Sequence, residues 1–219
     1  VQVPTHKTVQ RKHMHRLVFR TQAEKMRKVT QDTLDLARQG RAVLIGVRSV
    51  QTSALLHETF ACIAPDRPIA VLNAVNDEEE SQIVERAGVS GAITVATNMA
   101  GRGTDIKIDD AVRASGGLHV IIAETNDFGR IDRQLIGRCA RQGDPGTTRY
   151  YISMDEELMR RFLPKPFARL WSAQYASRTM RGAFAKAMVR IAQRRAERLA
   201  YAQRKSSLES EIAVEKGTI

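Results

Sequence analysis

The sequence predicts a doubly wound α/β fold, in which helices cover both faces of a parallel β-sheet, followed by a long basic C-terminal helix. Apolar runs of strand length alternate with polar, helix-like stretches from residue 15 to residue 162. These runs are nearly continuous, as expected for parallel strands buried on both faces. Beyond residue 163 the strand-like runs stop and the chain becomes rich in arginine.

The first predicted elements are a short strand over 15–20 and a helix that begins after Thr21. Thr21 and Glu24 have the spacing of a capping box, and Gly40 is a suitable helix stop. Three strands are then expected over 42–47, 69–74 and 92–97. The helices expected between them lie over 51–61 and 77–87.

The second half of the sheet is predicted to contain strands over 118–124 and 148–153 and helices over 131–141 and 155–162. Pro164 and Pro166 mark a break. From 174 to 207 there is no strand signal, and a long helix is expected there. Its apolar face is predicted to carry Met180, Phe184, Met188, Ile191, Leu199 and Ala202. We therefore expect an N-terminal lead-in segment over 1–14, a sheet domain over 15–163 and a helical segment over 164–219 with a frayed C-terminus.

Length and composition exclude several classes of protein. With 219 residues, of which 42% are hydrophobic, the chain can bury a core. It has no apolar run long enough to predict a membrane-spanning helix. It begins with Val1 and shows no leader-like segment, so a fragment of a longer protein is expected. Its two cysteines cannot form a disulfide framework, which favours a reducing compartment.

The positive charge of the chain is concentrated near its C-terminal end. The formal net charge is +11, and residues 160–205 contain thirteen Lys or Arg but a single acid, Glu197. A segregated basic segment indicates an anionic partner, namely nucleic acid, an anionic lipid surface or an acidic face of another domain. The alternative is a solvated helix face without a partner.

The first candidate loop follows the strand expected over 92–97. It contains Gly101, Arg102, Gly103 and Asp105. In parallel sheets, ligands bind beyond the carboxyl ends of the strands, so the loops after Val47, Ala74, Thr97 and Glu124 are the places where a ligand is expected. The glycines allow a close backbone approach, and they present the arginine on a tight turn. A purely structural turn is the alternative interpretation.

The second candidate loop lies near the end of the helix expected over 131–141. Arg138 and Arg141 are three residues apart, so on a helix they would share one face and reach one anion. Guanidinium groups bind phosphate oxygens through paired hydrogen bonds. The Asp144-Pro145-Gly146 turn signal ends the helix soon afterwards. The alternative is a basic surface helix. The five histidines show no spacing typical of metal ligands, and no metal site is expected.

The two loops resemble sequence motifs of a known family. VATNMAGRGTDIKI and RIDRQLIGRCARQGDPG closely resemble motifs V and VI of the SecA preprotein translocase ATPases, whose paired RecA-like motor domains belong to helicase superfamily 2. The similarity covers about residues 1–207. It includes VPT, VLIGVRSVQTSALL, VLNAVNDEEESQIV, YYISMDEELMRRF and, at the start of the helical scaffold domain, AQRRAERLAYAQRK.

This resemblance implies a RecA-like second motor domain that contacts ATP and Mg²⁺. Arg102 would reach the γ-phosphate, and Arg138 and Arg141 would sense or stabilise it. The resemblance also places Gly101, Gly103, Asp105 and Gln134 beside the nucleotide. The implied partners are the first motor domain and the preprotein-binding domain of the same protein, the membrane protein-conducting channel, unfolded preprotein and anionic lipid, in preference to nucleic acid. The implied location is cytoplasmic, at the inner face of the cell membrane.

Several positions depart from the family pattern, and one part of an ATP site is absent. Gly129 and Ile136 stand where arginine is usual, and Ala140 stands where glycine is usual. The dipeptide Gly-Lys of a phosphate-binding loop does not occur in the chain. We therefore expect the chain to supply arginines to ATP held mainly by a first motor domain outside it, and to lack ATPase activity alone. Two alternatives stay open, a nucleic-acid-dependent helicase-type module and a non-catalytic SecA-like scaffold or regulatory domain.

Overall fold

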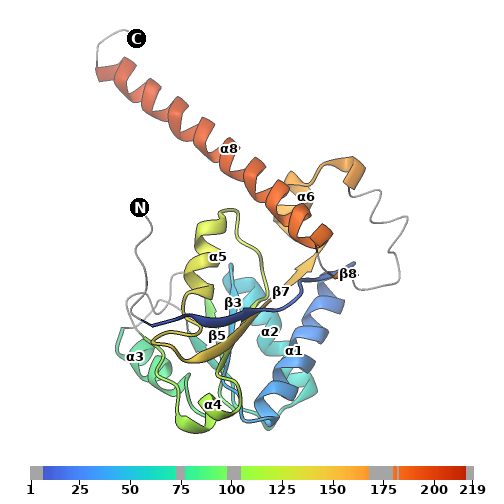
Figure 1. Ribbon diagram of the computed structural model, residues 1–219. Coiled ribbons are helices and arrows are strands. Elements are labelled where there is room, and N and C mark those ends of the chain that lie inside the picture. The colour runs from blue at the N-terminus through green and yellow to red at the C-terminus, as the bar shows by residue number, and fades with distance from the viewer. Residues whose placement is uncertain (1–6, 73–76, 98–104, 168–179, 182, 216–219) are drawn as a thin grey trace.

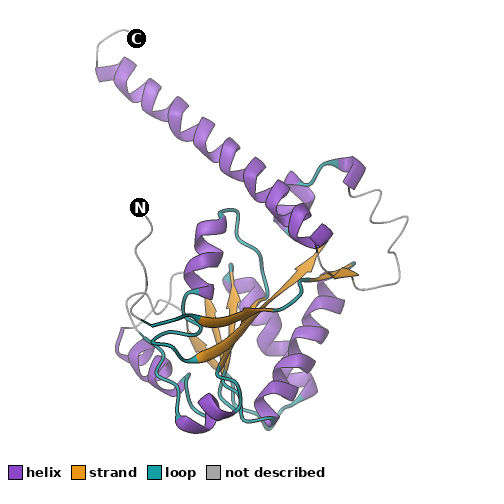
Figure 2. Ribbon diagram, viewed as in Figure 1, coloured by secondary structure: helices purple, strands orange, loops and turns teal. Residues whose placement is uncertain are grey.

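The computed structural model describes residues 7–72, 77–97, 105–167, 180–181 and 183–215, and it shows a twisted sheet between layers of helices (Figures 1 and 2). The strands are β1 Gln10–His13, β2 Leu17–Phe19, β3 Val43–Val47, β4 Ala70–Leu72, β5 Ile93–Thr97, β6 Leu118–Ile122, β7 Pro145–Ser153 and β8 Met180–Arg181. The helices are α1 Gln22–Arg38, α2 Val50–Ile63, α3 Asp77–Arg86, α4 Asp110–Ala114, α5 Gly129–Ile136, α6 Glu157–Phe162 and α8 Ala183–Glu215.

The sheet has the strand order β4-β5-β3-β6-β7-β2-β8, and β1 also pairs with β7. The pairs are parallel except for β2 with β8. The parallel sheet and the long C-terminal helix confirm the predicted fold class. β1 runs beside the start of β7, with Gln10 opposite Pro145, and β2 runs beside its end. The segment expected to lead into the domain therefore adds a strand to the sheet.

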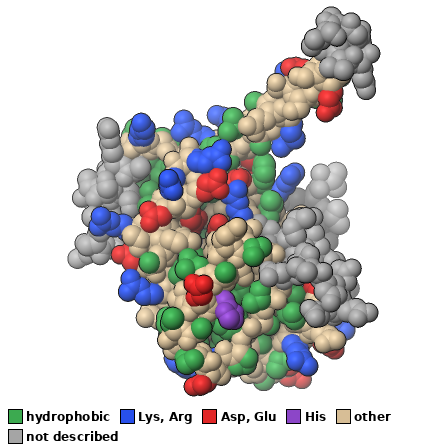
Figure 3. All heavy atoms as spheres, turned by 180° about the vertical axis from the view of Figure 1, so that it is seen from behind, with side chains coloured by type: hydrophobic (Ala, Val, Ile, Leu, Met, Phe, Trp, Pro, Cys, Tyr) green, Lys and Arg blue, Asp and Glu red, His purple; other side chains and the backbone are tan. Residues whose placement is uncertain are grey.

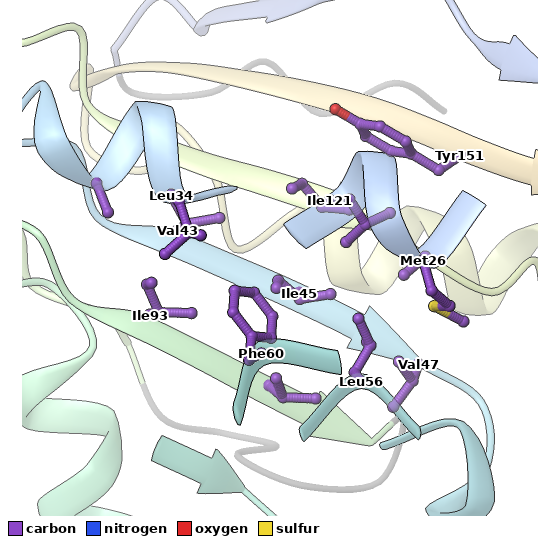
Figure 4. Close-up of a cluster of buried hydrophobic side chains, with 14 of the residues drawn as sticks. Met26, Leu34, Val43, Ile45, Val47, Leu56, Phe60, Ile93, Ile121 and Tyr151 are labelled. Carbon is purple, nitrogen blue, oxygen red and sulfur yellow. The ribbon is translucent and has the colours of Figure 1, made fainter. Parts of the chain in front are cut away.

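Each face of the sheet has its own hydrophobic core, as the near-continuous apolar strands predicted. Alternate residues of β3 point to opposite faces: Val43 and Ile45 belong to one cluster and Leu44 to the other. The first core lies against α1 and α2, and Figure 4 shows Met26, Leu34 and Phe60 from those helices packed on the strands. The second core lies against α3, α4 and α5.

A third cluster joins the start of α8 to the sheet domain. Buried side chains of α8 pack with residues of β2, β7 and α6; they are Ala185, Met188, Val189, Ala192 and Ala196. From Tyr201 to Ile212 every residue of α8 is exposed, and this part of the helix stands clear of the sheet domain (Figures 1 and 3). The first half of α8 is thus part of the packed structure.

The capping box at Thr21 is confirmed, because Glu24 N donates to the Thr21 hydroxyl and Thr21 N donates to the Glu24 carboxylate. Other predictions need correction. The helix expected to reach Arg141 ends at Ile136, helix α4 was not expected, and β8 forms where no strand signal was found. The predicted apolar face of the long helix is partly wrong, because Leu199 is 43% exposed. Within the described residues no helix has the length and apolar character needed to span a bilayer.

Candidate functional site

The two candidate loops meet through Asp105 and Arg141. Arg141 Nη1 lies 2.9 Å from Asp105 Oδ1, and the Gln142 side-chain amide donates to Oδ2 at 3.0 Å. Arg141 Nε also donates to the backbone oxygen of Gly137, at 3.0 Å. Both carboxylate oxygens and two edges of the guanidinium are therefore engaged, which fixes the orientation of the Arg141 side chain.

The other residues predicted for this site differ in what the structure shows of them. Gly101, Arg102 and Gly103 lie outside the described residues. Arg138 is half-buried in the loop after α5, while Gln134 is exposed on α5 itself. Asp105, three positions after Arg102 in the chain, is the residue through which the first loop is shown to contact the second.

Arg138 and Arg141 do not share a helical face as predicted, because the backbone turns between them. After the end of α5, Ala140 and Gln142 adopt positive φ angles of 56° and 55°, and Gly143 follows with 85°. Such left-handed residues cannot continue a right-handed helix. The glycine usual in the family at position 140 would adopt this conformation without a Cβ penalty. The arginines are thus presented from a tight loop.

This loop is held in place from several directions. Arg11 on β1 donates through Nη1 to the backbone oxygens of Ile136 and Cys139, at 3.1 and 3.3 Å. The buried Cys139 thiol lies 3.4 Å from Leu118 O, and burial raises its pKa to about 11. A protonated thiol with this surrounding is a packing group and not a nucleophile. The role of Arg11 could not be seen in the sequence, because its partners are backbone atoms more than 120 residues away.

The location of this loop differs from the general expectation for parallel sheets. Cys139 packs against Leu118, the first residue of β6, and against Gly146, the second residue of β7. The Arg138–Arg141 loop therefore lies near the amino ends of these strands. Ile106, next to Asp105 in the chain, belongs to the second core, on the face of the sheet covered by α5. The Asp105–Arg141 pair consequently lies on this face of the sheet and not beyond the carboxyl ends.

The carboxyl ends of the strands carry a different set of polar groups, which sequence reasoning missed. The carboxylate of Glu124, after β6, accepts hydrogen bonds from the backbone N–H groups of Arg48 and Ser49. Nearby, the fully buried Lys25 ammonium lies 2.6 Å from Glu156 and donates to Ala123 O. These groups satisfy one another. In the sequence, the one indication of this buried ion pair is that Lys25 occupies a core-facing position of α1.

A buried carboxylate, Asp132, connects α5 with α8. Its Oδ1 accepts from the side-chain amide of Asn126 at 2.8 Å, and its Oδ2 accepts from the Gln193 amide of α8 at 2.8 Å. Burial raises the pKa of Asp132 to about 6, although these hydrogen bonds act in the opposite direction. The loop arginines and the long helix are thus joined through α5.

The donor set of the loops suits a phosphate anion. Arg138 and Arg141 are planar cations in a tight loop, and no hydrogen bond among the described residues engages Arg141 Nη2. The side chain of Arg141 is 40% exposed, so part of it is accessible from outside. Among the described residues no group of three or more His, Cys, Asp or Glu side chains could hold a metal ion.

Comparison with known proteins supports the family to which the sequence motifs point. Residues 8–112 and 107–173 match the family model described as SecA P-loop domain. The chain belongs to the SecA family. It is 46% identical over 162 residues to the protein translocase subunit SecA of Campylobacter curvus (strain 525.92), a match that covers 74% of this chain and 18% of that protein. It is 43% identical over 210 residues to the protein translocase subunit SecA 2 of Chlorobium chlorochromatii (strain CaD3), covering 95% of this chain and 31% of that protein.

This SecA-family chain therefore spans less than a third of the length of these relatives. Among solved structures, it resembles the yeast DEAD-box splicing factor Prp28, with a TM-score of 0.56, 19% identity and coverage of 78% of this chain and 35% of that one. It also resembles the Mss116p DEAD-box helicase domain 2 bound to an RNA duplex, with a TM-score of 0.52, 17% identity and coverage of 70% and 58%. At these identities the likeness shows the fold alone, which is that of a RecA-like helicase domain.

Proposed function

We propose that this chain contains the second motor domain of a SecA-like ATPase that drives protein export. In this proposal it supplies Arg102, Arg138 and Arg141 to ATP and Mg²⁺ held mainly by a first motor domain outside the chain. The observation that carries the proposal is the ion pair between Asp105 and Arg141, because it joins the two loops whose sequences resemble motifs V and VI. Residues 15–163, together with strand β1 of the same sheet, would form the motor domain, and residues 164–219 the scaffold segment.

The contribution of the chain to catalysis would be electrostatic. Hydrolysis of ATP provides the free energy, and charge on the phosphate oxygens changes as the phosphoryl group is transferred. Arg138 and Arg141 would bind those oxygens, and an arginine in this role accelerates phosphoryl transfer by roughly 10³–10⁵. Asp105 would be a positioning residue, since it limits the rotamers open to Arg141 before the nucleotide arrives.

The same arginines would join nucleotide chemistry to domain motion. Guanidinium groups from this domain would hold the two motor domains together while the triphosphate is intact and release them after hydrolysis. The hydrogen bonds of Asp132 to Asn126 and Gln193 would transmit this change to α8. The remaining proposed partners are the preprotein-binding domain, unfolded preprotein, the membrane channel and anionic lipid near the basic α8. We place these interactions in the cytoplasm, at the inner face of the cell membrane.

The test uses the complete protein that contains this chain. Arg141→Ala and Arg138→Ala should each lower ATP turnover by about 10³-fold or more, the effect expected for loss of an arginine that stabilises transferring phosphate. Arg38→Ala, which removes an exposed arginine of α1, is the matched control and should leave turnover unchanged. The isolated chain should show no turnover above background. Turnover that survives both loop substitutions would refute the proposed role of the arginines.

A further inference from the structure

A pocket of about 600 Å³ lies between the β1–β2 connection, α5, β7 and the start of α8, and neither Asp105 nor Arg141 lines it. Its volume is in the range of pockets that hold small ligands. Neither the sequence motifs nor the proposed function accounts for it. Gly129 contributes to this space, because a Cβ at that position would approach the Gln193 and Arg133 side chains.

The side chains that line this pocket are strongly biased towards positive charge. They include Arg16, Arg133 and Lys186, together with His13 and His15, and none of the described residues that line it is Asp or Glu. Within the described residues no acidic side chain forms an ion pair with Arg16, Arg133 or Lys186. These cations come from three separate elements of the structure. Their proximity is therefore a result of the tertiary fold and not of their spacing along one helix.

The positive charge around the pocket affects the pKa of His13. Partial burial and the positive charges of Arg11, Arg16 and Lys186 lower the pKa of its imidazole. Cations therefore repel additional positive charge at this position, which is the condition that attracts an anion. The buried Asp132 also acts on Arg16, but its carboxylate is engaged by Asn126 and Gln193.

Arg16 is held in an orientation suited to ligand binding. Its guanidinium carbon lies 4.1 Å from the centroid of the Tyr150 ring, so the guanidinium interacts with the aromatic face. The guanidinium is half-buried, and burial lowers its pKa. The in-plane N–H groups of an arginine held over a ring remain able to donate paired hydrogen bonds to an oxyanion.

We propose that this pocket binds a phosphate group, through Arg16 from the β1–β2 connection and Lys186 from α8, with Arg133 of α5 at its side. The ligand is a small phosphate-bearing anion or the phosphate of a lipid headgroup. Because Gln193 also lines the pocket and donates to Asp132, an occupant contacts the junction between α5 and α8. This inference goes beyond the proposed ATP contacts and does not depend on them.

The experiment measures binding of inorganic pyrophosphate to the 219-residue chain by titration calorimetry at constant ionic strength. Arg16→Gln and Lys186→Gln should each weaken binding about tenfold or more, because each removes a charge-assisted contact. Arg190→Gln removes the same charge from an exposed position of α8 that does not line the pocket, and it should weaken binding less than twofold. Gly129→Leu should abolish binding by filling the space. Arg141→Ala should leave it unchanged, which separates this pocket from the proposed ATP contacts.

A second arm distinguishes the two sources of phosphate. Sedimentation with phosphatidylglycerol vesicles replaces pyrophosphate, and phosphatidylcholine vesicles serve as the neutral control. Pyrophosphate binding with the expected loss in the Arg16 and Lys186 variants identifies a free phosphate ligand, while vesicle binding alone with the same losses identifies a headgroup. Absence of binding in both arms, or equal weakening by Arg190→Gln, overturns the proposal. Because Lys186 is exposed, its variant tests the proposal even if Arg16→Gln unfolds the chain.

Discussion

Protonation of the buried His119 should destabilise the fold below neutral pH. The side chain is 1% exposed on β6, and Nδ1 lies 2.6 Å from the Thr147 hydroxyl. Burial, followed by the charges of Arg41 and Arg149, lowers its pKa from 6.5 to about 3. The folded protein therefore keeps His119 neutral under conditions in which the unfolded chain takes up a proton.

The sign and size of the effect follow from this difference in pKa. Because the pKa of His119 is lower in the folded state than in the unfolded chain, its contribution to the free energy of unfolding is fully present above pH 6.5. This contribution is lost as the pH falls towards 3. At about 1.4 kcal/mol per pH unit below 6.5, lowering the pH from 7 to 5 should remove about 2 kcal/mol from the free energy of unfolding. His119→Asn keeps a polar atom near Thr147 but does not titrate in this range.

The assay is urea unfolding of the parent chain and His119→Asn at pH 7 and pH 5. The variant should lose about 2 kcal/mol less than the parent between the two pH values, whatever its stability at pH 7. His57→Asn, which replaces an exposed histidine on α2, controls for removal of a histidine. A difference below about 0.5 kcal/mol between parent and His119→Asn would refute the reasoning, because it would show that His119 is not held neutral by the fold.

Three further substitutions test other buried contacts. The pKa of Asp132 is raised to about 6, so its contribution to stability is fully present below pH 3.8 and is lost as the pH rises through 6. On lowering the pH from 7 to 5 the parent regains part of this contribution, and the free energy of unfolding of Asp132→Asn should therefore fall by about 1 kcal/mol more than that of the parent in the same assay. Equal losses would contradict this. Lys25→Met leaves the Glu156 carboxylate buried without its partner and should cost about 3–5 kcal/mol in urea unfolding at pH 7, whereas a cost under 1 kcal/mol would mean that water reaches the carboxylate. Gly46→Ala places a Cβ 2.0 Å from Leu135 Cδ2 and should cost about 1–3 kcal/mol, part of which Leu135→Val should restore; no recovery would show that α5 is not the obstacle.

The elements predicted best are those whose evidence is local. The capping box of Thr21 and Glu24 marks the start of α1 correctly, and the apolar run over 42–47 corresponds to β3. The elements predicted worst depend on distant partners. β1 contains Gln10–His13, a polar segment without strand character, and it is a strand because it pairs with β7, more than 130 residues away. The two-residue strand β8 likewise exists through its pairing with β2.

The candidate site divides in the same way. The motif residues could be named from the sequence because their types and spacing are local, but the contact between Asp105 and Arg141 could not. The helical face expected to join Arg138 and Arg141 is also absent, since Ala140 and Gln142 turn the backbone in a left-handed conformation that neither residue type predicts. Arg11 and Cys139 hold this loop through groups that no spacing rule connects.

The amino-acid sequence by itself determined the fold class and the family, because periodicity, capping and motif spacing are properties of neighbouring residues. The role of the motif arginines in binding ATP stays a prediction. Only the tertiary structure decided how the Arg138–Arg141 loop is shaped, that Asp105 reaches it, and that Arg16, Arg133 and Lys186 surround one pocket. The physical reason is that charge pairing, burial and backbone strain depend on distances through space. Folding sets those distances between residues that the chain keeps far apart.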